Sequence, residues 1–292
     1  MVSLESTALI VDVLPEVGGK LGQIRDRLSG REILVAPQRP YRTIPLDGDW
    51  LEGDTSGMDD CFPNIAAGPY PTQPWNATEL PDLGEWTHGS WDVMESESNR
   101  VALERSGHAL PYWARKVVRF ADAHTLEFSY RIENRSDSPL RYMWSAHPLI
   151  AVQDCYELRL PPGDLSFCTF PTDGASHKWP KYGAADLSKE WIARSTNLKI
   201  FLTGLTAGWC ELRLPEHTLT FTFDSLTTPV VGVWFNNFGF PEGSTQPFRC
   251  IAVEPCTSAS DLLDELPAGA YPCLGARAST EWSFRMEIKP NR

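Results

Sequence analysis

The chain has 292 residues, of which 42% are apolar and 22% charged, a composition that supports a sizeable core and excludes disorder of the whole chain. Its 38 acidic and 26 basic residues give a net charge of −12, which disfavours nucleic acid and anionic membranes as partners. The seven cysteines are irregularly spaced and no CxxC, HxH or HExxH motif occurs, so we expect no disulfide framework, no metal site and no cofactor.

The N-terminal segment lacks the basic start and long apolar stretch of a secretion signal. No apolar run approaches the roughly 18 residues of a membrane helix. We therefore expect a cytoplasmic protein.

Alternation of apolar and polar residues predicts short strands along most of the chain. They lie near 8–13, 113–120, 125–132, 140–150, 155–160, 198–203, 209–214, 218–224, 230–236, 248–254 and 281–288. Turn sequences such as EVGGK and LPPGD separate them. One helix is expected over 258–266, with Thr257 or Ser258 as its N-cap and Pro267 ending it. The pattern indicates an all-β fold, a large antiparallel sandwich or barrel, in one domain spanning 1–292.

The segment Ile44–Trp91 shows little alternation and is rich in Gly, Pro, Asp and Trp. A loop of this length inside a compact domain is usually functional. A disordered insertion is the alternative, but disordered segments are poor in aromatic residues and this one holds several. We expect an ordered loop that forms part of a site.

Three short motifs occur in order along the chain. They are LPDLGEWTHGSW at 80–91, with CFPNIA upstream; NRSDSPLRYMWSAHPLI at 134–150; and IAVEPCT at 251–257. Together they resemble the aldose 1-epimerase, or galactose mutarotase-like, superfamily, and the resemblance runs from the GGKL turn at 18–21 to the last strand. It implies a galactose mutarotase-like β-sandwich with His147 as general acid, Glu254 as general base and His88 as a sugar contact.

The chemistry explains these residue types. To interconvert the anomers of an aldose, a base removes the proton of the C1 hydroxyl while an acid protonates the ring oxygen. The ring opens, C1 rotates about the C1–C2 bond, and the two groups exchange roles on closure. A His and a Glu suit this exchange because both titrate not far from neutral pH. The reaction needs no metal, nucleotide or covalent nucleophile.

Strand alternation helps to place the acid–base pair. Glu254 shares a strand face with Ala252 and Cys250, while Ile251 and Val253 point toward the core. Both candidates precede a proline, which sets them near strand ends. We therefore expect His147 and Glu254 to face each other across one sugar-sized cleft. Taken singly, a lone His on a strand is more often structural, and a Glu at a strand end is usually a solvated charge.

Further candidates would bind the sugar. Trp86, Trp91 and Trp179 offer aromatic faces for stacking, although most tryptophans in a large sandwich fill its core. Asp59 and Asp60 offer carboxylates to vicinal hydroxyls, with solvated loop acids as the competing explanation.

The sequence also departs from the family pattern. An arginine expected near CFPNIAAG is missing, and the nearest ones upstream are Arg39 and Arg42. The family's substrate-binding aspartate has no clear counterpart; Asp186 and Asp224 are weak candidates.

Three functions stay open, each with a small sugar as partner and a monomer or weak dimer as the expected state. The first is an aldose 1-epimerase acting on a free aldose. The second is a hexose-6-phosphate 1-epimerase, which requires basic residues such as Lys178, Lys181 and Arg115 to converge at the pocket. The third is a non-catalytic carbohydrate-binding or sensing protein, which is favoured if His147 and Glu254 do not face each other across one pocket. A two-carboxylate glycosidase using Glu254 with Asp59 or Asp60 ranks fourth.

Overall fold

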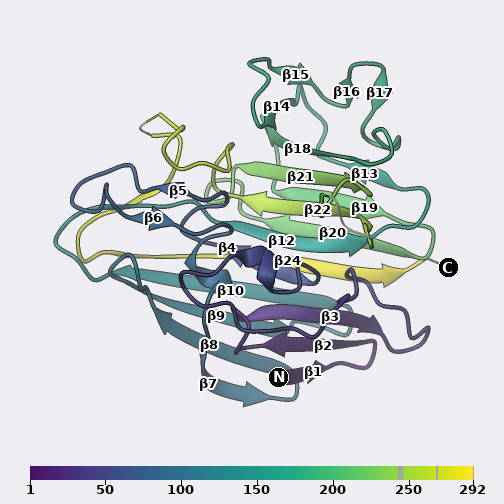
Figure 1. The fold of residues 1–292 in the computed structure, drawn as a ribbon. Coiled ribbons are helices and arrows are strands. Elements are labelled where there is room, and N and C mark those ends of the chain that lie inside the picture. Colours follow the sequence, from purple (N-terminus) through teal and green to yellow (C-terminus); the bar gives the residue numbers. More distant parts are fainter. Residues whose placement is uncertain (243–245, 268, 292) are drawn as a thin grey trace.

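Two large antiparallel sheets form the computed structural model, which describes residues 1–242, 246–267 and 269–291 (Figure 1). Buried apolar residues from both sheets make one continuous core, because each strand turns alternate side chains toward the other sheet. The predicted all-β sandwich class is confirmed.

The strands have the following bounds. The ten-stranded sheet contains, in spatial order, β1 (Val2–Glu5), β2 (Leu9–Leu14), β3 (Lys20–Asp26), β4 (Met58–Cys61), β12 (Ser145–Ala151), β22 (Arg249–Cys256), β21 (Val230–Asn237), β18 (Thr196–Thr203), β14 (Ser166–Phe170) and β15 (His177–Lys178). The eight-stranded sheet contains β13 (Glu157–Arg159), β19 (Trp209–Arg213), β20 (His217–Phe223), β24 (Ser279–Pro290), β10 (Thr125–Asn134), β9 (Tyr112–Phe120), β8 (Arg100–Ser106) and β7 (Asp92–Glu97). Three short pairs are β5 (Gly68–Pro69) with β6 (Glu79–Leu80), β11 (Leu140–Arg141) with β23 (Cys273–Leu274), and β16 (Lys181–Tyr182) with β17 (Ala185–Asp186).

The clearest alternating segments became central strands. In β10 the side chains of Phe128 and Tyr130 are buried, and Phe128 stacks on Phe284 of β24 at 4.5 Å between ring centroids. The EVGGK turn joins β2 to β3, with Gly18 and Gly19 both at φ +65°. A side chain at Gly18 would place its Cβ 2.6 Å from the carbonyl oxygen of Thr87, so this turn requires glycine.

The helix expected over 258–266 is wrong, because this segment forms turns. A nine-residue helix is marginal on its own propensity. Here the backbone bonds elsewhere: the carbonyl of Asp261 accepts from the amides of Ile65 and Ala66, and the Ser260 hydroxyl accepts from the amide of Leu262. The two helical elements in the described part of the chain are three-residue 3-10 turns, η1 (Trp50–Glu52) and η2 (Glu85–Thr87), and neither is long enough to cross a membrane.

The segment expected as a long ordered loop, Ile44–Trp91, is well packed. Its strand β4 enters the ten-stranded sheet between β3 and β12. The rest wraps the sheet, and Trp50 and Trp86 are buried. The segment therefore contains one strand of the ten-stranded sheet in addition to loops. The sequence did not predict this strand, because the segment shows little alternation of apolar and polar residues.

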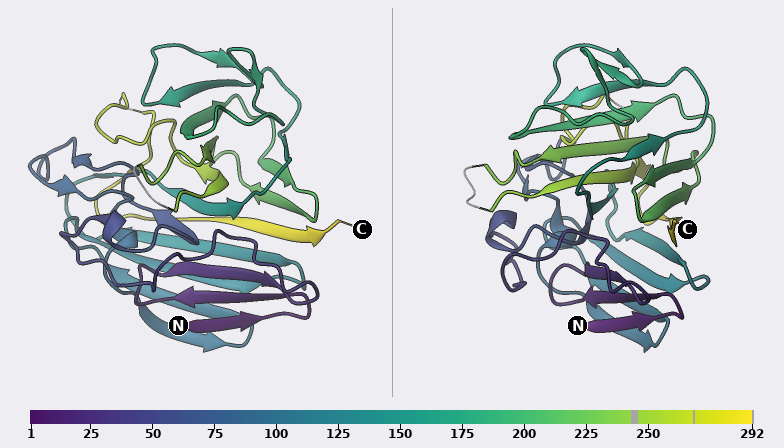
Figure 2. Two further views of the ribbon diagram at one scale, coloured as in Figure 1. Left: turned by 45° about the vertical axis from the view of Figure 1, so that its right-hand side comes forward. Right: turned by 90° about the vertical axis from the view of Figure 1, so that its right-hand side faces the viewer.

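The outer strands mark the two ends of the molecule. Both views of Figure 2 show β1–β3 and β7–β8 together at one end, and the segment holding β14–β17 at the other. The middle of the ten-stranded sheet is thus formed by β12, β22, β21 and β18. This is the region that carries the candidate site.

Candidate functional site

His147 and Glu254 lie on the face of the ten-stranded sheet that points away from the other sheet. On β22, Ile251 and Val253 belong to the core between the sheets, while Cys250 and Ala252 pack in a separate cluster on the opposite face. Glu254 shares that second face by alternation. The predicted orientation of Glu254 is confirmed. The expectation that proline places both candidates near strand ends is wrong, because β12 continues past Pro148 and β22 past Pro255.

The two candidate catalytic groups are neighbours on adjacent strands. His147 Nε2 lies 3.7 Å from Glu254 Oε1, too far for a hydrogen bond but close enough for both to reach one small group. Glu254 is fully buried and His147 is 7% exposed. They lie side by side on the same face of the sheet, on the paired strands β12 and β22. The expectation that they face each other across a cleft is therefore wrong.

The second carboxylate oxygen of Glu254 is held by two donors. Lys199 Nζ of β18 forms an ion pair with Oε2, and Ser145 Oγ donates to the same atom at 3.1 Å. Lys199 Nζ also lies 3.9 Å from Asp261 Oδ1. In contrast, Glu254 Oε1, His147 Nδ1 and Asp261 Oδ1 are buried and have no hydrogen-bond partner among the residues that the structure describes. Buried polar atoms are normally paired, so these three atoms are candidates for contact with a ligand.

Burial perturbs the protonation of this cluster. It lowers the pKa of His147, an effect that Glu254 opposes and Lys199 reinforces, so the imidazole is mostly neutral at pH 7. Burial raises the pKa of Asp261 to about 7 despite the nearby Lys199. Burial opposes the charge of Lys199 as well, but Glu254 and Asp261 outweigh it and raise the pKa of the ammonium. Perturbed groups gathered at one cavity are typical of functional sites.

A cavity of about 290 Å³ opens above this face of the sheet, near the lower end of the roughly 300–1,000 Å³ range of small-molecule sites. His147, Lys199 and Asp261 line it, whereas the fully buried Glu254 does not. Much of the wall is aromatic and comes from Trp50, Phe170, Trp234 and Phe240. Trp234 stacks on the imidazole of His147 at 6.0 Å between centroids, and Phe240 packs edge-on against Trp234 at 5.3 Å.

The predicted loop contributes to this cavity through Trp50, Asp82 and Leu83. His88 does not line it. Its side chain is fully buried, with Nδ1 at 3.0 Å from the carbonyl oxygen of Gly84 and Nε2 at 3.2 Å from that of Gly48. In this structure His88 ties the loop together.

The three tryptophans predicted to stack on sugar lie elsewhere. Trp86 and Trp91 are buried in the core and pack edge-on against each other at 5.2 Å. Trp179 is partly buried against the same core, beside Phe167. Core packing accounts for all three.

The two predicted aspartates point to opposite faces of β4. Asp59 lies directly across from His147 in the sheet and forms a buried ion pair with Lys20 at 3.1 Å. Asp60 points between the sheets, where it meets Lys116 at 2.5 Å and the hydroxyl of Tyr130 at 2.7 Å. Neither lines the cavity. Asp59 acts on the site only as a neighbouring charge.

Sequence reasoning missed Lys199, Asp261 and Trp234. For Lys199 a signal existed, since a charged residue inside the apolar run LKIFL is unusual in a central strand. Asp261 was hidden in the segment expected to be helical. Of the weak candidates for a substrate-binding aspartate, Asp186 caps its own turn through Ser188, and Asp224 caps a turn at Leu226.

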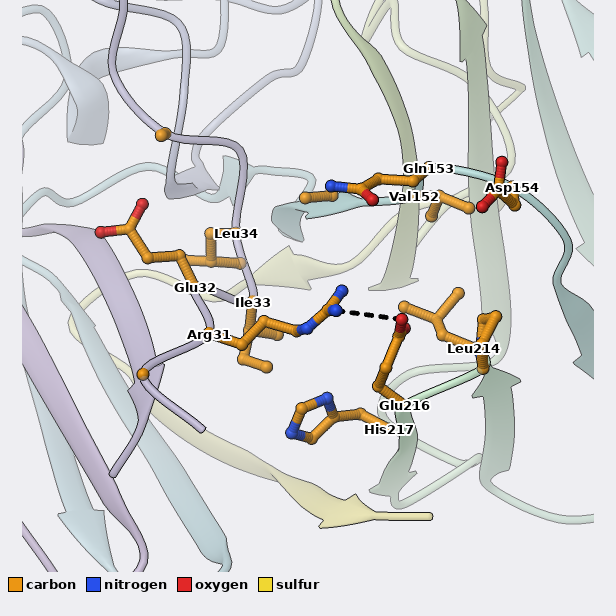
Figure 3. Close-up of a pocket in the computed structure, with 14 residues that line it drawn as sticks. Arg31, Glu32, Ile33, Leu34, Val152, Gln153, Asp154, Leu214, Glu216 and His217 are labelled. Carbon is orange, nitrogen blue, oxygen red and sulfur yellow. Dashed lines mark ion pairs between the residues drawn. The ribbon is translucent and has the colours of Figure 1, made fainter. Parts of the chain in front are cut away.

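A second cavity, of about 480 Å³, lies apart from these residues (Figure 3). Arg31 and Glu216 form an ion pair of 3.0 Å in it, and the buried His217 stands beside them, 3.4 Å from Asp26. None of the predicted site residues lines it. Of the two predicted catalytic residues, His147 lines the smaller cavity and neither lines this one.

Comparison with known proteins supports the fold. No protein-family model matches the chain, and no curated protein sequence matches it. Among solved structures, a putative aldose 1-epimerase from Escherichia coli K12 has a TM-score of 0.75 at 13% identity, covering 99% of each chain. A galactose mutarotase-like protein from Lactobacillus casei has a TM-score of 0.74 at 17% identity, covering 99% of this chain and 100% of the other. The GalM/aldose epimerase homologue from C. elegans has a TM-score of 0.68 at 13% identity, covering 100% and 99%. The chain thus has the galactose mutarotase-like fold.

Proposed function

We propose that the chain is an aldose 1-epimerase acting on a free aldose. The observation that carries this proposal is that His147, which lines an aromatic cavity, has its Nε2 only 3.7 Å from Glu254 Oε1. The C1 hydroxyl and the ring oxygen are bonded to the same carbon, so an acid and a base that stand side by side can serve both. Adjacent strands hold these two groups in that arrangement.

The roles follow from the environment of each atom. Glu254 Oε1 accepts the proton of the C1 hydroxyl, because its other oxygen is already occupied by Lys199 and Ser145. His147 protonates the ring oxygen, and the open-chain aldehyde then turns one or the other face before closure reverses both transfers. Trp234 and Phe240 offer apolar surface to the C–H face of the sugar.

Charge favours a free sugar over a phosphorylated one. Among the described residues that line the cavity, Lys199 is the only Lys or Arg, and it is already paired with Glu254. Asp82 and Asp261 add carboxyl groups to the same wall. Phosphate recognition needs Arg or Lys clustered at the pocket.

The basic residues considered for a phosphate do not converge. Lys178 pairs with Asp164 at 2.8 Å and Lys181 with Asp186 at 3.6 Å, both away from the cavity. Arg115 lies on β9 of the other sheet. Arg39 donates to backbone carbonyls of its own loop.

The pKa of His147 gives the proposal a pH dependence. Burial lowers this pKa below the usual 6.5, so the protonated imidazole that acts as acid becomes more abundant as pH falls. We expect the catalysed rate to rise as pH is lowered from 8 to 6. A rate that is flat over this interval, measured in buffers of constant ionic strength, contradicts this role of His147.

The direct test is anomer exchange, followed by polarimetry of fresh α-glucose and α-galactose and by NMR exchange at equilibrium. His147→Ala and Glu254→Gln should each lower the rate by about 10²–10⁴-fold, the usual contribution of a general acid or base. His124→Ala is the matched control, because this histidine bonds a strand carbonyl far from the cavity.

Each alternative has its own outcome. A wild-type protein that exchanges glucose-6-phosphate but not glucose is a hexose-6-phosphate 1-epimerase. One that shows sugar-dependent NMR shifts but only the spontaneous exchange rate is a carbohydrate-binding protein. The cytoplasmic location and the monomer or weak dimer stay predictions.

A further inference from the structure

We propose that Lys199 is a positioning residue for Glu254: it holds one carboxylate oxygen, Oε2, so that the other, Oε1, faces His147. This inference rests on the proposed function. It assigns a role to a residue that no motif of the sequence marks.

Lys199 and Ser145 together hold Glu254 Oε2, and we call these two contacts the clamp. Lys199 reaches across from β18 and pairs with Glu254 Oε2, which also accepts from Ser145 Oγ at 3.1 Å. Two donors on one oxygen fix the rotation of the carboxylate. As a result Oε1 is left without a hydrogen bond and faces His147 Nε2. Gly232 of β21 makes room for this side chain, since a Cβ there would lie 3.4 Å from Oε2.

Burial makes the positive charge necessary. Glu254 is 0% exposed, and burying a carboxylate without a compensating charge is costly. The ammonium of Lys199, itself only 7% exposed, compensates the charge without using the oxygen that must react.

Other charged groups face this pair from each neighbouring element. His147 stands on β12, Asp59 on β4 with its partner Lys20 from β3, and Asp261 on the segment after β22. The thiols of Cys61, Cys250 and Cys256 are also near, but burial raises their pKa values and keeps them neutral. Lys20 is engaged by Asp59 and two backbone carbonyls, so Lys199 is the cation that Glu254 contacts.

The test combines kinetics with a direct measurement of the carboxyl group. Lys199→Met keeps the unbranched shape and most of the length of the side chain and removes its charge. We expect kcat for anomer exchange to fall at least tenfold at pH 7, and the acidic limb of the pH–rate profile, which we assign to Glu254, to move to higher pH. Lys199→Arg should return this limb toward the wild type, and Lys289→Met, at an exposed lysine, should change nothing.

A second readout does not depend on activity. In protein labelled with ¹³C at Glu side chains, the Glu254 carboxyl signal, assigned by its loss in Glu254→Gln, should be protonated at a higher pH in Lys199→Met than in the wild type. Ser145→Ala removes one neutral donor from the same oxygen and should shift both readouts in the same direction by less. The Ser145→Ala variant serves as the test if Lys199→Met does not fold.

The outcomes separate the two proposals. If the pH–rate profile and the ¹³C titration of Glu254 are the same in Lys199→Met, Ser145→Ala and the wild type, the proposed role of Lys199 is overturned, even if the enzyme is active. A wild-type protein without anomer exchange overturns the proposed function, and the ¹³C titration then still decides whether Lys199 keeps Glu254 ionised. A raised KM for anionic sugars with an unmoved acidic limb would instead assign Lys199 to substrate binding.

Discussion

Asp261 shows how one buried residue links the site to stability. Its side chain lines the cavity, is 8% exposed, and has Oδ1 without a hydrogen bond. Burial raises its pKa to about 7 from the ordinary 3.8, so the folded protein binds a proton that the unfolded chain has released. Between these two pH values, stability falls as pH rises.

Asp261→Asn should therefore stabilise the protein at pH 8 and have little effect at pH 4. The expected gain is on the order of 4 kcal/mol, from about three pKa units at about 1.4 kcal/mol each. Urea denaturation at several pH values measures it. Asp264→Asn, at an exposed residue of the same segment, is the control. Wild-type and Asp261→Asn stability curves that run parallel across this range would contradict the expectation.

At the scale of an element, strand β21 shows how the packing of the sheet affects the site. It lies between β22 and β18, the strands that carry Glu254 and Lys199, so the ion pair must pass over it. Gly232 is paired with Glu254 in the sheet, and the absence of a side chain there leaves the path open. Two residues further along β21, the indole ring of Trp234 forms part of the wall of the cavity.

Gly232→Ala should impair catalysis more than folding. The new Cβ would lie 3.3 Å from Glu254 Cβ and 3.4 Å from Oε2, and the clamped carboxylate has little space to yield. We expect kcat to fall about tenfold or more, since small misplacements of reacting groups are costly, against a loss of about 1–3 kcal/mol in stability. Polarimetry of freshly dissolved sugar measures kcat, and urea denaturation measures the free energy of unfolding. Gly275→Ala, where the nearest atom is 3.9 Å away, should be silent in both assays.

At the scale of the whole molecule, a buried charge pair joins the two sheets. Asp60 of β4 meets Lys116 of β9 at 2.5 Å, and both are nearly inaccessible. Tyr130 donates to Asp60, and Lys116 also donates to the carbonyl of Gly19 at 2.9 Å. This network explains why Asp60, predicted to bind sugar, has a structural position.

Lys116→Met should destabilise the fold by about 3–5 kcal/mol, because it leaves Asp60 buried and unpaired. The double variant Lys116→Met/Asp60→Asn should recover a large part of that loss, since no uncompensated charge remains. Urea midpoints of both proteins provide the measurement, with catalysis per folded molecule unchanged because this pair lies on the far face of β4. Equal destabilisation in the single and double variants would show that packing, and not charge, dominates.

The sequence by itself determined the fold class and the face of the sheet on which Glu254 lies. Period-two alternation is a local property, so Phe128, Ile251 and Val253 could be assigned to the core and Glu254 to the opposite face. The motifs around His147 and Glu254 likewise identified two residues that the sheet brings to 3.7 Å.

Tertiary structure alone decided what surrounds them. Lys199, Trp234 and Asp261 come from separate segments, and strand order determines that they meet at one cavity. The same long-range packing placed Trp86, Trp91, His88 and Asp60 away from it, because large apolar and paired polar groups gain more by filling the interior. Alternation specifies which way a side chain points; only strand pairing and sheet packing specify what it meets.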